Sequence, residues 1–178
     1  MCYNSVVMRF INHTTVSDEF LREVIKFTCP PGVHGFDIAF KNSSRGYRGR
    51  AYTKGTCYHS FRTKSGKKIH RMNVPYIVIG RWTNQGMWRK PYAFAQGKGY
   101  LGVKVFSDEE ALVHLVAHEL RHLWQERVKS GRRVWGSRGQ FSERDADAYG
   151  LSCLRKWRRR KTLRCEGLSA SRNWSARA

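Results

Sequence analysis

The chain has 178 residues, of which 34 are Lys or Arg and 13 are Asp or Glu, so its formal net charge is +21. This length suits one domain with a hydrophobic core, and an apolar fraction of 40% excludes a chain that is disordered throughout. No apolar run approaches the ~20 residues that span a bilayer, the N-terminus lacks a signal-peptide pattern, and the five cysteines form no CxxC pair. We therefore expect a cytoplasmic protein with reduced thiols and no membrane partner.

The first predicted element in chain order is a helix over "TVSDEFLREVIKF". Ser17 is its expected N-cap, and "CPPG" is expected to end it. Three apolar stretches predict strands: "FDIAF" at 36–40, "VPYIVIGRW" at 74–82 and "YLGVKVF" at 100–106. Between residues 41 and 71 the chain is rich in Gly, Lys and Arg, which predicts a hairpin over "GRAYTKGTCYHSF" followed by a basic loop, "RTKSGKKIHR".

The second half of the chain predicts two helices. The stretch "SDEEALVHLVAHELRHLWQERVKSG" has Ser107 and Glu110 in capping-box spacing and Gly131 as a plausible stop, and it is apolar around much of its girth. It should therefore form a buried helix. Another helix is expected to start near Ser142 and to include "ERDADAYGLSCLRKWRRRK". The expected fold is α+β, with one domain over 1–161, an N-terminal helix, a mostly antiparallel twisted sheet and a flexible basic tail over 162–178.

The positive charge is unevenly distributed. No Asp or Glu occurs from Ala39 to Ser107, and aromatic residues are interleaved with the basic ones. Such a surface attracts polyanions, and aromatic rings can stack on unpaired bases, so DNA or RNA is an expected partner. The candidate contact residues are Arg45, Arg48, Arg50, Lys64, Lys67, Lys68 and Arg71. The alternatives are an acidic protein, an anionic membrane surface, or a role in solubility alone.

The stretch "HLVAHELRHLWQ" carries the strongest chemical signal. Residues four apart share one face of a helix, so His118 and His122 can both direct an imidazole nitrogen at one metal ion. Glu119 lies one position further round, where its carboxylate can act as a general base. A catalytic Zn²⁺ site needs a third protein ligand and one open position. His114, one turn earlier, is expected to be packed or hydrogen-bonded rather than to be a fourth ligand.

The third ligand is expected in "SERDADAYG". Glu143 and Asp147 again share one helical face, so Glu143 can complete the coordination and Asp147 can accept the free ring N–H of a ligand histidine. Asp145 is the fallback ligand if the helix starts later. Tyr149 and Arg144 are candidates for stabilising the oxyanion.

The pattern HELRH followed by ERDAD resembles the gluzincin clan of zinc metallopeptidases, especially the compact minigluzincins of bacteria and phages. The resemblance covers roughly residues 100–160. It implies a zincin-like fold in which His118, His122 and Glu143 bind zinc, Glu119 is the general base, and Asp147 supports the site.

The expected function is therefore hydrolysis of peptide bonds by a metal-activated water, with a protein or peptide substrate that pairs with a sheet edge and with action at or near nucleic acid. The main alternative is a nucleic-acid-binding protein in which the zinc site is structural or degenerate. A metal-dependent nuclease and a toxin-like peptidase that cuts one repressor are further alternatives. The sequence makes no prediction of the oligomeric state.

Overall fold

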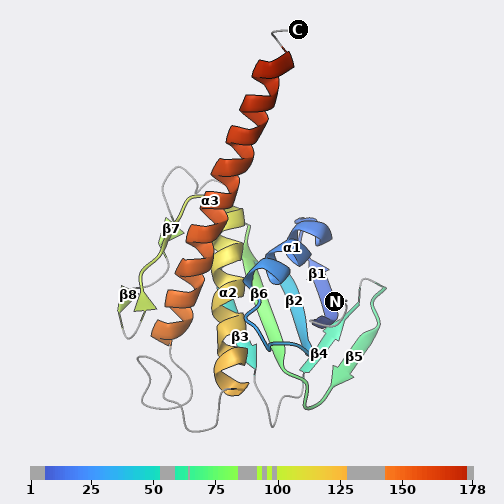
Figure 1. Ribbon diagram of the computed structural model, residues 1–178. Coiled ribbons are helices and arrows are strands. Elements are labelled where there is room, and N and C mark those ends of the chain that lie inside the picture. The colour runs from blue at the N-terminus through green and yellow to red at the C-terminus, as the bar shows by residue number, and fades with distance from the viewer. Residues whose placement is uncertain are drawn as a thin grey trace.

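The computed structural model describes residues 7–52, 59–63, 65–83, 92–93, 96–97, 100–127 and 143–175 (Figure 1). The protein is α+β, as predicted. Along these residues the elements are β1 (Val7–His13), α1 (Asp18–Thr28), β2 (Phe36–Ser43), β3 (Arg48–Tyr52), β4 (His59–Arg62), β5 (Lys68–Arg71), β6 (Tyr76–Trp82), β7 (Tyr92–Ala93), β8 (Gln96–Gly97), β9 (Tyr100–Leu101), β10 (Lys104–Val105), α2 (Asp108–Arg127) and α3 (Glu143–Ser175).

The main sheet has the strand order β1-β2-β6-β3 and is mixed. Strand β2 pairs in parallel with both β1 and β6, and only β3 runs antiparallel to its neighbour, β6. The prediction of a mostly antiparallel sheet is therefore wrong for this sheet. Parallel strands need a crossover connection, and α1 provides it between β1 and β2. The two-stranded ladders of the described residues, β4–β5, β8–β9 and β7–β10, are antiparallel.

The strands differ from the predicted ones in several places. Strands β1, β5, β7 and β8 were not predicted. Strand β3 pairs with β6, with Arg50 opposite Val78, so the predicted hairpin over 49–61 is wrong. The stretch 62–71, predicted as a basic loop, contains the last residue of β4 and the whole of β5, and these two strands pair with each other. The strand predicted over 100–106 is divided into β9 and β10 at Gly102, whose φ of 67° is incompatible with an extended strand.

The helices begin as their capping residues predict. In α1 the Phe20 N–H donates to Ser17 Oγ at 3.2 Å. In α2 the Glu110 N–H donates to Ser107 Oγ at 3.1 Å, and the Glu110 carboxylate accepts the N–H of Phe106 at 3.0 Å. These contacts satisfy backbone donors that the first turn of a helix leaves without partners. The predicted stop at Gly131 lies outside the described residues.

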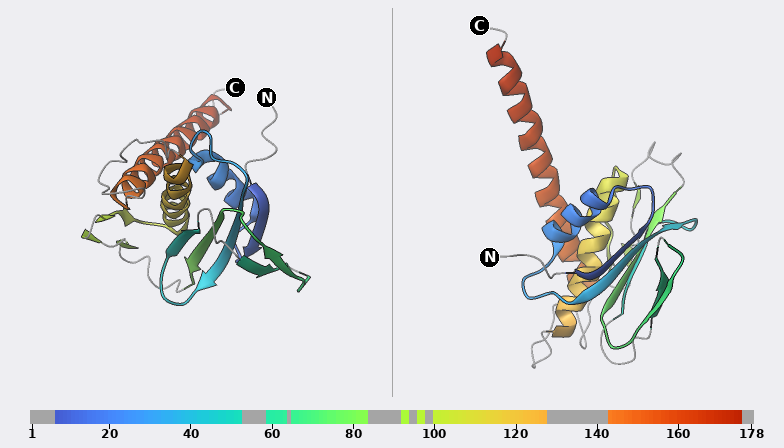
Figure 2. Two further views of the ribbon diagram at one scale, coloured as in Figure 1. Left: turned by 90° about the horizontal axis from the view of Figure 1, so that it is seen from below. Right: turned by 90° about the vertical axis from the view of Figure 1, so that its right-hand side faces the viewer.

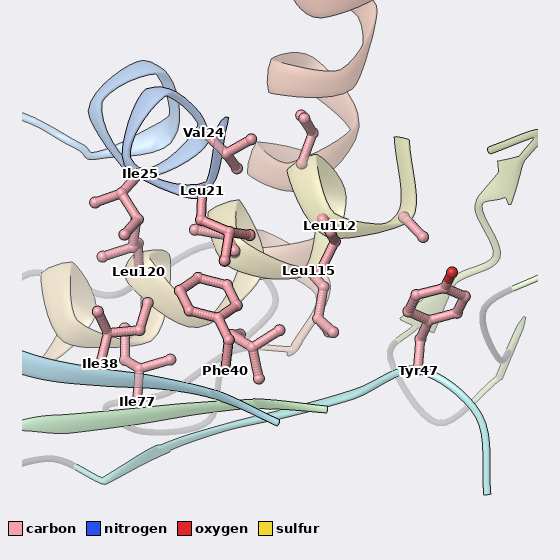
Figure 3. Close-up of a cluster of buried hydrophobic side chains, with 14 of the residues drawn as sticks. Leu21, Val24, Ile25, Ile38, Phe40, Tyr47, Ile77, Leu112, Leu115 and Leu120 are labelled. Atoms are coloured by element: carbon pink, nitrogen blue, oxygen red, sulfur yellow. The ribbon is translucent and has the colours of Figure 1, made fainter. Parts of the chain in front are cut away.

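The hydrophobic core lies between the sheet and the helices. Figure 3 shows α1 and α2 packed on one face of the sheet, which presents the alternate residues of β2 and β6. Each large side chain fully buried there stabilises the fold by about 1.5–3 kcal/mol. The fully buried core residues of these four elements include Leu21, Val24, Phe36, Ile38, Phe40, Ile77, Ile79, Val113, Val116 and Leu120.

The β4–β5 hairpin covers part of the opposite face (Figure 2, right). Ile69 packs there against a small buried cluster that includes Ala39 and Tyr76. The Arg71 Nε donates to the fully buried carboxylate of Asp37 at 3.1 Å. Arg71, predicted to contact nucleic acid, therefore anchors the hairpin to β2.

Helix α3 packs antiparallel to α2 along most of the length of α2. Near the start of α2, Trp157 Nε1 donates to Glu109 at 3.0 Å and Arg158 donates to Glu110 at 2.9 and 2.6 Å. The helix, predicted to give way to a tail near residue 161, continues to Ser175, and its end projects beyond the rest of the protein (Figure 1). None of the helices among the described residues has the length and apolar character needed to cross a bilayer.

Candidate metal centre

Helix α2 brings two imidazole rings together at its junction with α3. His118 and His122 are one turn apart and both are buried, and their Nε2 atoms lie 3.1 Å from each other. Their rings are nearly perpendicular, with centroids 4.8 Å apart. Both Nε2 atoms therefore face the same small volume, as the i, i+4 spacing predicts.

The first residue of α3 adds a carboxylate to this pair. The Oε2 atom of Glu143 lies 3.1 Å from His118 Nε2 and 3.4 Å from His122 Nε2. A tetrahedral Zn²⁺ ion with bonds of about 2.0–2.1 Å has ligand atoms roughly 3.3 Å apart, so two nitrogens and one oxygen at these separations fit such an ion. The side chain of Glu143 is 41% exposed, which leaves the cluster accessible from solvent.

The other ring nitrogens of both histidines have partners. His118 Nδ1 is 2.8 Å from Asp147 Oδ1, and His122 Nδ1 is 2.9 Å from Gln125 Oε1. Acceptors at Nδ1 place the ring proton there and leave the Nε2 lone pair for a cation. Asp147 was predicted for such a contact; Gln125 was not, although its position three residues after His122 puts it on the same helix face.

Asp145 holds Gln125 in place. It accepts from Gln125 Nε2 at 2.9 Å and from Arg121 at 2.6 and 3.0 Å. These contacts use both of its oxygens, so Asp145 is not placed as the fallback ligand. The Tyr149 hydroxyl donates to the Thr28 carbonyl at 2.9 Å, which directs it toward α1. The other oxyanion candidate, Arg144, is exposed.

The carboxylates of Glu143 and Asp147 place negative charge next to the imidazole of His118. Burial would lower the pKa of His118, but the hydrogen bonds to Asp147 and Glu143 outweigh burial and raise the pKa to about 9. Hydrogen bonds from His118 and His122 hold the pKa of the Glu143 carboxyl well below its usual range. The carboxylates thus favour positive charge between the rings, which is the electrostatic condition for cation binding.

Glu119 lies on the side of α2 that faces β3. It is only 4% exposed, and burial raises its pKa against the lowering effect of His118 and His122. A Cβ atom added at Gly49 of β3 would lie 2.3 Å from Glu119 Oε1 and 2.5 Å from its Cγ. The carboxylate therefore occupies space that only a glycine at position 49 leaves open, a contact that the sequence did not predict.

His114 is packed rather than placed among the ligand atoms. Its ring centroid is 6.3 Å from that of His118, and burial together with the charge of His118 lowers its pKa to about 4. A Cβ atom at Gly150 of α3 would lie 3.0–3.1 Å from the His114 carbonyl and ring. The buried, uncharged imidazole thus fills the contact between α2 and α3.

The residues predicted to contact nucleic acid lie on different elements of the structure. Arg45, Arg48 and Arg50 line one groove beside β3. Lys67 and Lys68 are exposed on the β4–β5 hairpin, and Lys64 lies outside the described residues. Arg71 differs from these exposed residues because its guanidinium is paired with the buried carboxylate of Asp37.

Comparison with protein-family models, curated proteins and solved structures returns no match to this chain.

Proposed function

We propose that the protein is a zinc-dependent metallopeptidase of the gluzincin type, with a zincin-like arrangement of its site helix and edge strand. The observation that carries this proposal is the convergence of three potential ligand atoms, from His118, His122 and Glu143, all within 4.8 Å of one another. Two imidazoles and one carboxylate with an open side make the usual ligand set of a catalytic zinc site. The adjacent Glu119 supplies a carboxylate that is not engaged as a ligand in this cluster.

When bound, zinc would polarise a substrate carbonyl and lower the pKa of a water molecule. Glu119 accepts the proton of the attacking water on its carboxylate and delivers it to the leaving amine nitrogen. Asp147 keeps a proton on His118 Nδ1, and Gln125 keeps one on His122 Nδ1, so both rings hold one orientation throughout.

The substrate in this proposal is an extended peptide bound along β3. Among the described residues this strand lies at one end of the order β1-β2-β6-β3, so it is the strand to which we assign the added peptide. The Ala51 N–H of this strand donates to the Glu119 carboxylate. Gly49 of the same strand touches Glu119, which brings a peptide paired with β3 close to the general base.

The test is a pair of variants. Glu119→Gln should retain one zinc per chain and lose hydrolysis of a casein or mixed-peptide substrate by about a hundredfold or more, because it removes the general base. His122→Ala should lose the metal. Full activity in Glu119→Gln would contradict the assignment of the base.

The second candidate function is nucleic-acid binding with a structural or degenerate zinc site, which the net charge of +21 favours. If this function is correct, the unmodified protein binds zinc but cleaves no member of a peptide library. If the zinc is structural, the protein also unfolds when zinc is removed. Metal analysis and peptide-library cleavage of the same preparation separate the two functions.

A further inference from the structure

A groove of about 770 Å³ opens on the face of the main sheet opposite α2. Side chains alternate between the faces of a strand, so Gly49 and Ala51 of β3 face the helix while Arg48 and Arg50 face the groove. The groove continues past Val78 and Gly80 of β6 to the end of β2 and the turn that follows it.

The groove is lined by four cations, Lys41, Arg45, Arg48 and Arg50, all exposed. Within the part of the chain that the structure describes, none of the four forms an ion pair with an acidic side chain. Two acids touch other lining residues: Asp108 accepts from the Tyr47 hydroxyl and from Arg81 Nε, and Glu119 contacts Gly49 from the helix side of β3. The four positive charges therefore repel one another, and an anion in the groove would relieve this repulsion.

The floor of the groove is shaped to hold these side chains. A Cβ atom at Gly80 would lie 2.7 Å from Arg48 Cγ, so the stem of Arg48 lies flat over a glycine. The Arg50 guanidinium lies 4.8 Å from the centre of the Tyr52 ring, and Tyr52 stacks on Tyr76. Asn42, Ser43 and Ser44 add polar groups at one end.

We propose that this groove binds single-stranded nucleic acid. Arg48 and Arg50 lie two residues apart on one face of β3, where they can meet neighbouring phosphates of a phosphodiester backbone, and their guanidinium planes present faces on which unpaired bases can stack. A duplex keeps its bases stacked inside and offers no unpaired base to the guanidinium planes of the groove. The inference does not depend on peptidase activity, because the groove and Glu119 lie on opposite faces of β3.

The test is fluorescence anisotropy with a labelled oligothymidylate of about twelve nucleotides, a length within the range that such grooves bind. The protein is the zinc-loaded full chain carrying Glu119→Gln, so that binding is measured without proteolysis. Arg48→Gln/Arg50→Gln should weaken binding about tenfold or more and should reduce the slope of log affinity against log salt by about 1.4, or 0.7 for each lost phosphate contact.

The matched control is Arg155→Gln/Lys156→Gln, which removes the same charge from two exposed residues of α3. It should leave the affinity within about twofold, since it changes only the long-range field. Ser44→Glu adds a negative charge at the exposed end of the groove without removing packing and should also weaken binding, whereas Ser152→Glu on α3 should not.

A chemical footprint locates the ligand independently. Oligothymidylate should protect Lys41 from acetylation and leave Lys156 reactive. The proposal is overturned if the groove variant binds as tightly as its parent, if the α3 control loses as much affinity, or if a duplex or vesicles of anionic phospholipid compete better than the single strand.

Discussion

Gly49 of β3 and Glu119 of α2 are in direct contact, and the absence of a side chain at position 49 is what allows it. Helix α2 packs against β3 beside the candidate metal centre, and the Glu119 carboxylate is buried between them. The orientation of the proposed general base therefore depends on a residue of a strand that contributes no metal ligand.

Gly49→Ala should displace Glu119 and reduce peptide hydrolysis by about tenfold or more while zinc content stays at the parent level. The Cβ would overlap the Glu119 Cγ at 2.5 Å, which a movement of the carboxylate alone cannot relieve. Steady-state kinetics and metal analysis of the same preparation check this. A variant with parent kcat would contradict the proposed role of the contact.

A double-mutant cycle provides the control for that prediction. Gly49→Ala should lower the melting temperature of the parent but not of Glu119→Ala, in which the overlapping atoms are gone. If Gly49→Ala lowered the melting temperature equally in the parent and in Glu119→Ala, the strain would come from a contact of β3 other than that with Glu119.

Gln125→Leu should weaken zinc affinity by about 10–100-fold, because His122 Nδ1 loses the acceptor that orients its ring. Competition with a chromophoric chelator measures the affinity. Asp147→Asn should have a comparable effect through His118. Ser152→Ala, an exposed change on α3, should leave the affinity unchanged. Parent affinity in Gln125→Leu would show that the amide does not position the ligand.

His114→Ala should keep one zinc per chain and lower the free energy of unfolding by about 2–4 kcal/mol. The imidazole fills a buried contact with Gly150, so its removal leaves a cavity between α2 and α3. Zinc analysis and urea denaturation of the zinc-loaded protein check the two parts separately. Loss of zinc with an intact fold would instead identify His114 as a ligand.

Zinc should raise the melting temperature of the metal-free protein, since an ion held by His118, His122 and Glu143 links α2 to α3. At a free concentration of 100 times Kd the gain is about 2.7 kcal/mol. Glu143→Ala should reduce this gain, and magnesium should not reproduce it, because two imidazoles suit zinc better than magnesium. Differential scanning calorimetry with and without a chelator measures both.

The ion pair between Glu110 and Arg158 should make stability depend on acid pH. Burial raises the pKa of Glu110, but hydrogen bonds from Arg158 and the Phe106 N–H outweigh burial and lower the pKa below its ordinary 4.5. A carboxyl with a lowered pKa in the folded state contributes stability above its unfolded pKa and loses it as the pH falls. Glu110→Gln should therefore cost about 1 kcal/mol at pH 7. The difference should shrink as the pH falls below 4.5 and vanish once the pH is below the lowered pKa of the folded state.

Denaturant titrations of parent and variant across this pH range give the result. Arg158→Gln should show the same loss at pH 7, and the double variant should lose little more than either single change. A difference between Glu110→Gln and its parent that stays constant down to pH 3 would exclude the ion pair as its source.

Local signals predicted the helices and two of the strands well. Ser17 and Ser107 identify helix starts because capping is decided by residues within one turn. The continuous apolar runs at β2 and β6 mark buried strands. Strand direction and pairing were not predictable in the same way, because they depend on contacts between distant segments such as β1 with β2 and β3 with β6.

In the candidate site, too, the residues related by local spacing could be predicted and those related by long-range contacts could not. The i, i+4 spacings of His118 with His122 and of Glu143 with Asp147 are local, and the structure brings all four side chains together. Gln125 could have been found by the same spacing argument applied one turn further. Gly49 could not, because a glycine in a strand gives no sign of which helix lies against it.

Glu143 and Asp147 are one helical turn apart, so the position of α3 along α2 decides which of the two carboxylates faces the metal and which faces His118 Nδ1. A slip of α3 by one turn, about 5.4 Å, would put one carboxylate where the other had been and would still leave an acid beside His118. The motif therefore does not define its own alignment. Contacts along the rest of the two helices define it, from Gly150 against His114 to Arg158 with Glu110 and Trp157 with Glu109, the last two roughly 22 Å along α3 from Glu143. Substitutions at that distant end can thus change metal affinity without altering any residue of the site.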